Sequence, residues 1–248
     1  MTDFEKIFLL DIGFTNAFKQ EILEFIYTGL QKPSKKYYIV SPNSELLVNA
    51  QKDSGYKSIL NNAKIALPDG IGVMWGARFT GRPLKQRITG VDFMESLCKY
   101  VSKRHITVSF LGGGPSIADK TAECLQKKYP GLKVSWVSQE YRSSLNNKVT
   151  DILFVAFGSP KQEIWISKNL QNLNARVVMG VGGSFDFISG KITRAPNFLQ
   201  NLGLEWLFRL IIQPWRIRRQ VSLVNFIFLV LRDKLFAEKD SKSYNTTI

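Results

Sequence analysis

Short apolar segments alternate with longer amphipathic segments along most of the chain, and this alternation is the clearest structural signal in the sequence. Seven short apolar runs predict buried strands at residues 7–12, 37–40, 65–66, 106–111, 133–137, 152–156 and 177–181. Apolar residues at helical spacing predict helices near residues 16–30, 43–51, 90–103, 116–128, 160–169 and 198–210. This alternation predicts an α/β fold, with a Rossmann-like, mainly parallel sheet and helices on both faces.

The loops that follow five of these strands carry the most distinctive residues of the chain. They read S-P-N-S-E at 41–45, L-P-D-G-I-G-V at 67–73, G-G-G-P-S at 112–116, F-G-S-P-K-Q-E at 157–163 and G-G-S-F-D-F at 182–187. Parallel sheets bind ligands beyond the carboxyl ends of their strands. Five such loops therefore predict one composite pocket.

Glycines in three of these loops indicate what the pocket binds. Gly112, Gly113, Gly158 and Gly182 would let backbone N–H groups approach a phosphate closely. Neither the G-x-G-x-x-G fingerprint nor a P-loop is present, and a lone glycine triplet is more often a tight turn. The repetition of glycine-rich loops favours a phosphate or sugar site.

The polar residues of the loops each have two interpretations. Asp69 in P-D-G is either a turn-forming residue or a general base that takes a proton from an acceptor hydroxyl. Asn43 is either a helix cap or a pocket residue. Gln162 and Glu163 are either residues of a first helical turn or hydrogen-bond partners of a base or sugar. Arg87 lies in a basic loop that is either solvated or in contact with a diphosphate.

The last quarter of the chain is basic and amphipathic. It contains R-A-P at 194–196, G-L-E-W-L-F-R-L at 203–210 and Q-P-W-R-I-R-R-Q at 213–220, followed by an apolar run at 221–231. Arginines interleaved with Trp, Phe and Ile are typical of a surface that meets a membrane or an anionic, greasy ligand. We therefore expect an α/β catalytic core over residues 1–193. Residues 194–248 are expected to form a small helical appendage that faces the acceptor and the membrane.

Charge and composition narrow the choice of partners. The net charge of +14 over 248 residues fits a nucleic acid, a nucleotide or anionic lipid. The basic residues of the tail lie beside bulky aliphatic residues, which disfavours nucleic acid. One His, no paired metal-spacing Cys and no D-x-D motif predict that no metal is bound. The apolar run is too short to span a bilayer, and the N-terminus lacks the features of a signal peptide.

Taken together, the motifs strongly resemble the WecG/TagA/CpsF glycosyltransferase family. The resemblance covers about residues 37–219 and rests on P-N-S-E, L-P-D-G-I-G-V, R-I-T-G-V-D, F-L-G-G-G-P, F-G-S-P-K-Q-E, G-V-G-G-S-F-D-F-I-S-G and R-A-P…G-L-E-W-L-F-R-L. It implies a metal-independent, inverting transferase that moves a sugar from a UDP-sugar to a polyprenyl-diphosphate-linked amino sugar. The implied place is the cytoplasmic face of the bacterial plasma membrane, in teichoic-acid, common-antigen, capsule or exopolysaccharide synthesis.

The resemblance also assigns roles to residues. The family's proposed base falls on Asp69, and its other pocket positions fall on Asn43, Arg87, Gln162 and Ser41, where the family has Thr. Arginines thought to hold the acceptor diphosphate fall on the region that includes Arg209, Arg216 and Arg219, with Arg194 in the R-A-P block before it. The chain departs from the family at Gln213 and Gln220, where Glu and Tyr are common.

Several questions stay open at this point. The donor could carry N-acetylmannosamine, its uronic acid, glucose or galactose, and the sequence does not decide between a monomer and a homo-oligomer. One alternative function is a basic membrane- or nucleic-acid-binding protein with a degenerate nucleotide-sugar pocket. A hydrolase acting on a sugar nucleotide is another, although no nucleophile motif supports it.

Overall fold

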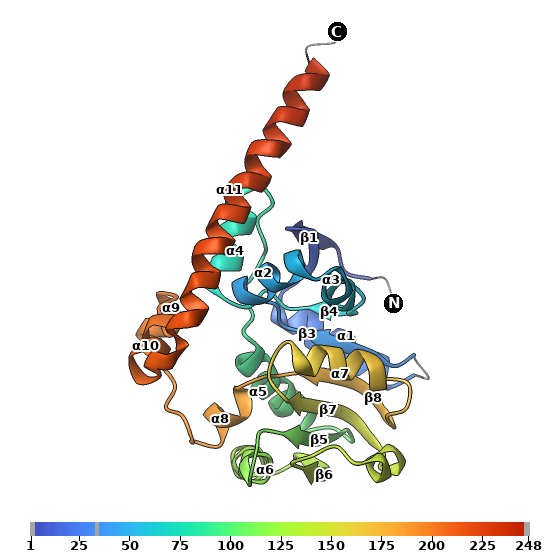
Figure 1. Ribbon diagram of the computed structural model, residues 1–248. Coiled ribbons are helices and arrows are strands. Elements are labelled where there is room, and N and C mark those ends of the chain that lie inside the picture. Colours follow the sequence, from blue (N-terminus) through green and yellow to red (C-terminus); the bar gives the residue numbers. More distant parts are fainter. Residues whose placement is uncertain (1–2, 33–34, 246–248) are drawn as a thin grey trace.

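The fold is built on a six-stranded parallel sheet with the strand order β4–β3–β8–β7–β5–β6 (Figure 1). The computed structural model describes the backbone of residues 3–32 and 35–245, and it omits the side chains of residues 201, 216, 218–220 and 236–245. The strands are β3 (Tyr37–Val40), β4 (Ile65–Ala66), β5 (Thr107–Gly112), β6 (Lys133–Ser138), β7 (Thr150–Ala156) and β8 (Ala175–Gly180). The predicted mainly parallel α/β fold is confirmed.

Two layers of helices cover the sheet, because side chains alternate between its faces. Along β7, Ile152 and Phe154 point into one hydrophobic cluster, and Leu153 and Val155 point into the other. The first face is covered by α1 (Lys19–Leu30), α5 (Gly90–Val101), α6 (Ile117–Lys128) and α8 (Ser184–Ile188). The second is covered by α2 (Ser44–Lys52), α3 (Ser54–Asn61), α4 (Ile71–Phe79) and α7 (Lys161–Asn169). A short 3-10 helix, η1 (Ser143–Asn147), precedes β7.

The N-terminal segment differs from the sequence prediction. The single strand expected at 7–12 is instead a hairpin of β1 (Lys6–Leu9) and β2 (Ile12–Thr15), which forms a separate antiparallel sheet. Leu10 and Asp11 form the turn at φ values of 51° and 58°. A two-residue turn with both φ values positive usually contains Asn and Gly, so Leu-Asp at this place does not signal a hairpin.

The helix predictions also needed correction. Helices α3 and α4 are not among the helices predicted from the sequence. The helix expected at 198–210 is divided into α9 (Asn197–Asn201) and α10 (Glu205–Ile212). Gly203, at a φ of 73°, lies in the break between them. A Cβ added at this position would lie 2.9 Å from the Ile71 Cβ, so the absence of a side chain allows Gly203 to pack closely against Ile71.

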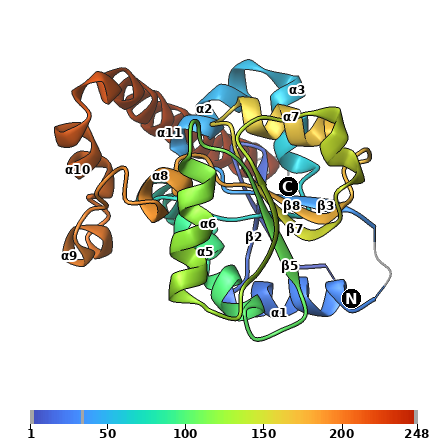
Figure 2. The same ribbon diagram turned by 90° about the horizontal axis from the view of Figure 1, so that it is seen from below.

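The C-terminal helix packs against the core. After a short 3-10 helix, η2 (Pro214–Arg216), α11 (Ile217–Asn245) runs back along α2 and α4, whereas α9 and α10 stand to the side of the sheet (Figures 1 and 2). Phe226 and Val230 of α11 are fully buried in the same cluster as Leu46 and Val73. The last quarter thus contributes to the core, and the proposed boundary between residues 193 and 194 stays a prediction.

Candidate functional site

A two-lobed cavity lies beyond the carboxyl ends of the strands. Its polar lobe, about 420 Å³, is lined by residues from all five predicted strand-end loops, and the composite pocket is thereby confirmed. Its other lobe, about 260 Å³, lies between α4 and the C-terminal helices and is more apolar, with Ile71, Trp206 and Leu223 in its wall. The residues that line both lobes are Asn43, Glu45, Asp69, Thr89, Glu205 and Arg209.

Asp69 lies where the two lobes meet. Its Oδ2 accepts a hydrogen bond of 3.0 Å from the backbone N–H of Gly90 at the start of α5. Because this partner is 21 residues away, the side chain does not simply close its own turn. Burial raises the pKa of Asp69 to about 6, even though the Gly90 hydrogen bond and Arg209 oppose the rise; Glu205 and Asp92 add to it. A carboxylate with this pKa can accept a proton near neutral pH.

Ser41 and Asn43 lie in the loop after β3, and both line the polar lobe. Asn43 caps α2, since its Oδ1 accepts from the Leu46 N–H at 3.1 Å, and it also lines both lobes. Both interpretations of Asn43 are therefore compatible with its position. Ser41 lines the polar lobe, and its Oγ is 2.8 Å from where a Cβ on Gly90 would lie. A side chain at position 90 would therefore displace the Ser41 hydroxyl.

The four predicted glycines divide into two groups. Gly113, Gly158 and Gly182 line the polar lobe, all at positive φ. Gly112 does not line it. A Cβ on Gly112 would lie 2.8 Å from the Ala156 carbonyl oxygen, so this residue allows β5 and β7 to approach closely.

The arginines of the site have distinct positions. Arg209 lines both lobes, and its guanidinium lies 4.2 Å from the centre of the Phe187 ring. Arg87 lines the apolar lobe and donates to the Gln200 carbonyl at 2.8 Å, which ties its loop to α9. The side chains of Arg216 and Arg219, both predicted to bind substrate, lie outside the described part of the structure.

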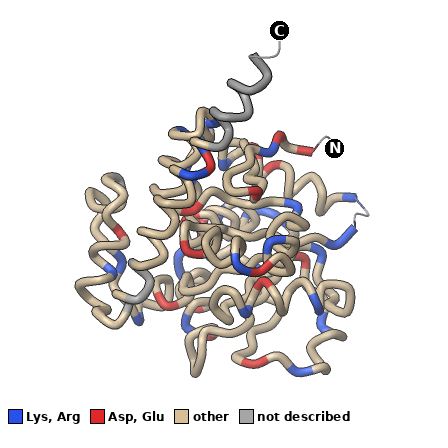
Figure 3. The backbone as a smooth tube through the Cα atoms, turned by 45° about the horizontal axis from the view of Figure 1, so that its top comes forward, with Lys and Arg blue, Asp and Glu red and all other residues tan. Residues whose placement is uncertain are grey.

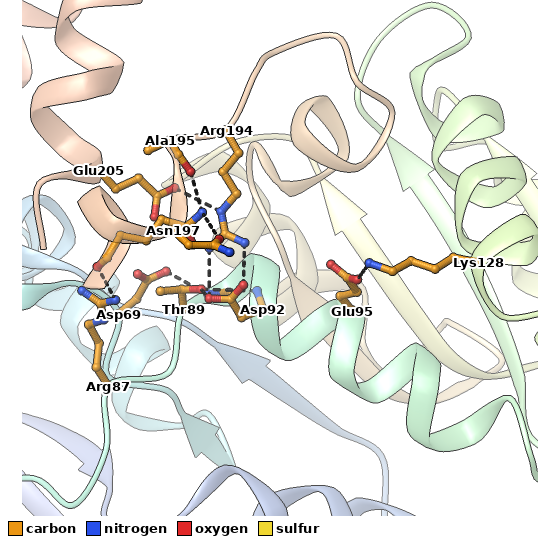
Figure 4. A network of polar contacts seen from close by, with 12 residues as sticks. Asp69, Arg87, Thr89, Asp92, Glu95, Lys128, Arg194, Ala195, Asn197 and Glu205 are labelled. Atoms are coloured by element: carbon orange, nitrogen blue, oxygen red, sulfur yellow. Dashed lines mark hydrogen bonds and ion pairs between the residues drawn. The ribbon is translucent and has the colours of Figure 1, made fainter. Parts of the chain in front are cut away.

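Arg194 lies outside the lining of either lobe and connects two elements (Figure 4). Its guanidinium donates to both carboxylate oxygens of Asp92 on α5, at 2.5 and 3.0 Å. Its Nε is 3.5 Å from Glu205 of α10. Although burial opposes the change, the bonds from Arg194 and Thr89 lower the pKa of Asp92. Arg194 thus holds α10 against the core, beside Asp69.

Gln162 and Glu163 begin α7 and are buried, at 3% and 1% exposure. Gln162 borders the polar lobe, whereas Glu163 lies behind it. Glu163 accepts hydrogen bonds from Gln162, Ser159 and Tyr56.

Thr89 and Glu205 line the cavity although sequence reasoning did not select them. Thr89 caps α5, with its Oγ accepting from the Asp92 N–H at 3.3 Å. Thr89 and Asp92 have T-x-x-D spacing, which is a helix-start signal that could have identified Thr89. Glu205 lines the cavity from α10, where its carboxylate lies 3.5 Å from Arg194 Nε, so its place depends on the packing of that helix.

The described part of the chain shows neither a metal cluster nor a membrane-spanning helix. Among the residues whose side chains the structure describes, no group of three or more His, Cys, Asp or Glu is placed to hold a metal ion. Nor does any helix of the described part have both the length and the apolar character needed to cross a bilayer.

The fold and cavity define an α/β protein with a polar cavity at the carboxyl edge of a parallel sheet, the place where such folds generally bind ligands. The model of the glycosyl transferase WecG/TagA/CpsF family matches residues 7–240, so the chain belongs to this family of glycosyltransferases.

Curated relatives agree with this assignment. A Bacillus spizizenii protein is 31% identical over 92% of this chain and 91% of its own length. A Bacillus subtilis protein is 32% identical over 83% and 82%, and a Staphylococcus aureus protein 29% identical over 92% and 93%. All three are named N-acetylglucosaminyldiphosphoundecaprenol N-acetyl-beta-D-mannosaminyltransferase.

Proposed function

We propose that this protein transfers an N-acetylmannosamine-type sugar from a UDP-sugar to a polyprenyl-diphosphate-linked GlcNAc-type acceptor, with inversion and without a metal. The observation that carries the proposal is the position of Asp69, at the junction of a polar lobe and an apolar lobe. A base at that point can take the proton of an acceptor hydroxyl as it attacks a donor held on the other side.

The polar lobe suits the donor. Gly113, Gly158 and Gly182 have no side chains and let the backbone of their loops approach a diphosphate, and Lys191 and Arg209 also line this lobe. These cations can stabilise the negative charge on the departing UDP. This is the role that a divalent ion has in other sugar transferases, so we propose that this one needs none.

The apolar lobe suits the acceptor. Ile71, Trp206 and Leu223 offer a surface for prenyl carbons beside Arg87 and Arg209, which can meet the diphosphate. The names of the relatives specify an acceptor of this kind, GlcNAc joined to undecaprenol by a diphosphate.

Exposed apolar side chains are frequent on the C-terminal helices and support attachment to a membrane. They are Phe198, Leu202, Trp206, Leu207, Ile211, Ile212, Trp215, Ile217, Val221, Val224, Ile227, Phe228, Leu231 and Leu235. Between residues 195 and 215 the only charged residues are Glu205 and Arg209, and Figure 3 shows the sparse charge of α9 and α10. We therefore place the protein peripherally on the inner face of a bacterial plasma membrane.

A transfer assay with a panel of donors tests the proposal. UDP-N-acetylmannosamine, its uronic acid, UDP-glucose and UDP-galactose are each incubated with synthetic prenyl-diphosphate GlcNAc, with and without excess EDTA. We expect one donor to give a disaccharide-lipid product whose linkage is inverted, at a rate that EDTA does not change. UDP release without acceptor would indicate a hydrolase, and a rate that EDTA abolishes and Mg²⁺ or Mn²⁺ restores would contradict the metal-free mechanism.

A further inference from the structure

Glu163 is a buried carboxylate whose three hydrogen-bond donors are all neutral. Its Oε1 accepts from Gln162 Nε2 and from Ser159 Oγ, each at 2.7 Å, and its Oε2 accepts from the Tyr56 hydroxyl at 3.3 Å. Burial raises its pKa, although these hydrogen bonds oppose the rise. Burying an ionised carboxylate lowers the stability of the fold. We therefore expect Glu163 to have a role that requires a hydrogen-bond acceptor at this position.

The neighbouring amide of Gln162 is fully engaged within the protein. Its Nε2 donates to Glu163 and, at 3.1 Å, to Ser159 Oγ, and its Oε1 accepts from the Gly182 N–H at 2.8 Å. Gln162 therefore joins the loop after β7, which contains Gly158, to the loop after β8, which contains Gly182. Its amide also packs on the end of β8, because an added Cβ on Gly180 would lie 3.1 Å from Nε2.

The charge of Glu163 decides which way this amide faces. An ionised carboxylate only accepts hydrogen bonds, so it must meet the NH₂ group of Gln162 and leaves the amide oxygen for Gly182. With a neutral Gln at position 163, either end of the Gln162 amide could face it. In the flipped orientation, the NH₂ group would meet the Gly182 N–H, and that hydrogen bond would be lost.

We propose that Glu163 is a positioning residue that orients Gln162, and that Gln162 acts as a strut fixing the spacing of the Gly158 and Gly182 loops. The pair acts on the donor through backbone geometry rather than by touching it. A preset spacing matters because hydrogen-bond donors that need no rearrangement stabilise developing charge best. The effect on the donor rests on the function proposed above, whereas the strut itself does not.

Glu163→Gln tests the strut without any ligand. The amide exchange of Gly182 is measured by NMR in the free protein, together with the thermal midpoint. We expect Gly182 to exchange at least about tenfold faster, as befits loss of a hydrogen bond. Tyr56→Phe is the matched control, because it removes a hydrogen bond to the same carboxylate but leaves Gln162 oriented. Unchanged Gly182 exchange in Glu163→Gln would overturn the strut.

Steady-state kinetics test the link to the donor. Glu163→Gln should raise the KM for the UDP-sugar about tenfold and change the KM for the acceptor little. The double variant Gln162→Glu/Glu163→Gln again places one carboxylate beside one amide, with the two residues exchanged. It should therefore bring the KM for the UDP-sugar much of the way back to the native value. A donor KM that is unaffected while Gly182 exchange is faster would overturn the positioning role.

Two further arms keep the outcomes separate. If Glu163→Gln does not fold, Gln162→Met removes the same bond to Gly182 and leaves Ser159 and Tyr56 to donate to Glu163, and the same two measurements apply. If the native protein turns over no UDP-sugar, the proposed function fails, whereas the Gly182 exchange still decides whether the strut exists.

Discussion

Asp69 lies in surroundings that disfavour its charged form, which lowers the stability of the fold when the carboxyl is ionised. Its carboxylate is buried beside Glu205, and a single backbone N–H from Gly90 holds one of its oxygens. These surroundings raise its pKa to about 6 and leave it a stronger base than a solvated Asp.

We expect Asp69→Asn to lower kcat by about 10²–10⁴-fold, the usual contribution of a positioned base. In the native enzyme, kcat should rise with pH through about 6, where Asp69 loses its proton. Donor affinity, measured by calorimetry with UDP, should be unchanged. Turnover close to the native rate in the variant would remove Asp69 from this role.

The same substitution should stabilise the fold at high pH. The pKa of Asp69 is about 6 in the folded state and 3.8 in its ordinary state, so stability is lost as pH rises between these values. Asp69→Asn removes that loss. We expect its unfolding free energy to exceed the native value by on the order of 2–3 kcal/mol at pH 8, and by little below pH 4. Urea unfolding at the two pH values measures this, and equal stability at pH 8 would contradict it.

At the level of elements, the parallel sheet and its loops could be predicted, because buried strands and glycine-rich strand ends leave local signals. The hairpin could not, since Leu10 and Asp11 adopt a turn that usually requires other residues. Helix α4 was missed because Gly72 and Gly76 weaken its helical pattern. In the structure these glycines make room for tertiary contacts with Ser44 and Phe226.

The site followed the same rule. Asp69, Asn43 and the glycines lie in loops where the sequence predicted them, because strand ends converge in any parallel sheet. The engagement of Arg194 with Asp92 and of Gln162 with Gly182 could not be predicted. These contacts join segments distant in sequence and depend on the packing of whole helices.

Helix α11 allows a matched test of core against surface. Phe226 is fully buried against Gly76, whereas Phe228, two residues on, is 64% exposed. Phe226→Ala should cost about 3–5 kcal/mol of unfolding free energy, as expected when a buried ring is removed. Phe228→Ala should cost less than about 0.5 kcal/mol. Urea unfolding compares them, and equal losses would show that α11 does not belong to the core.

For the molecule as a whole, the apolar side chains of the C-terminal helices and the basic charge are expected to act together at a membrane. Ile211, Trp215 and Phe228 are 70%, 71% and 64% exposed. Their replacement by Gln should reduce binding to vesicles containing anionic lipid at least about tenfold, because it removes apolar burial in the headgroup region. The charge contribution would remain.

UDP affinity provides the control for this triple variant, since it should stay native. Native binding should also weaken as salt rises, because the electrostatic part is screened. Vesicle binding that is unchanged in the variant would mean that another surface docks.

The packing of Phe226 against Gly76 also affects the order in which the molecule folds. A Cβ on Gly76 would lie 3.0 Å from Phe226 and 3.1 Å from Leu9, so this contact joins the first strand, a central helix and the last helix. Contacts between such distant segments form late, because a long loop must close first. Leu223 of the same helix lines the apolar lobe. A chain that has not finished folding therefore lacks a complete apolar lobe. If that lobe holds the acceptor, as proposed, such a chain should not bind a lipid-linked sugar before its core is closed.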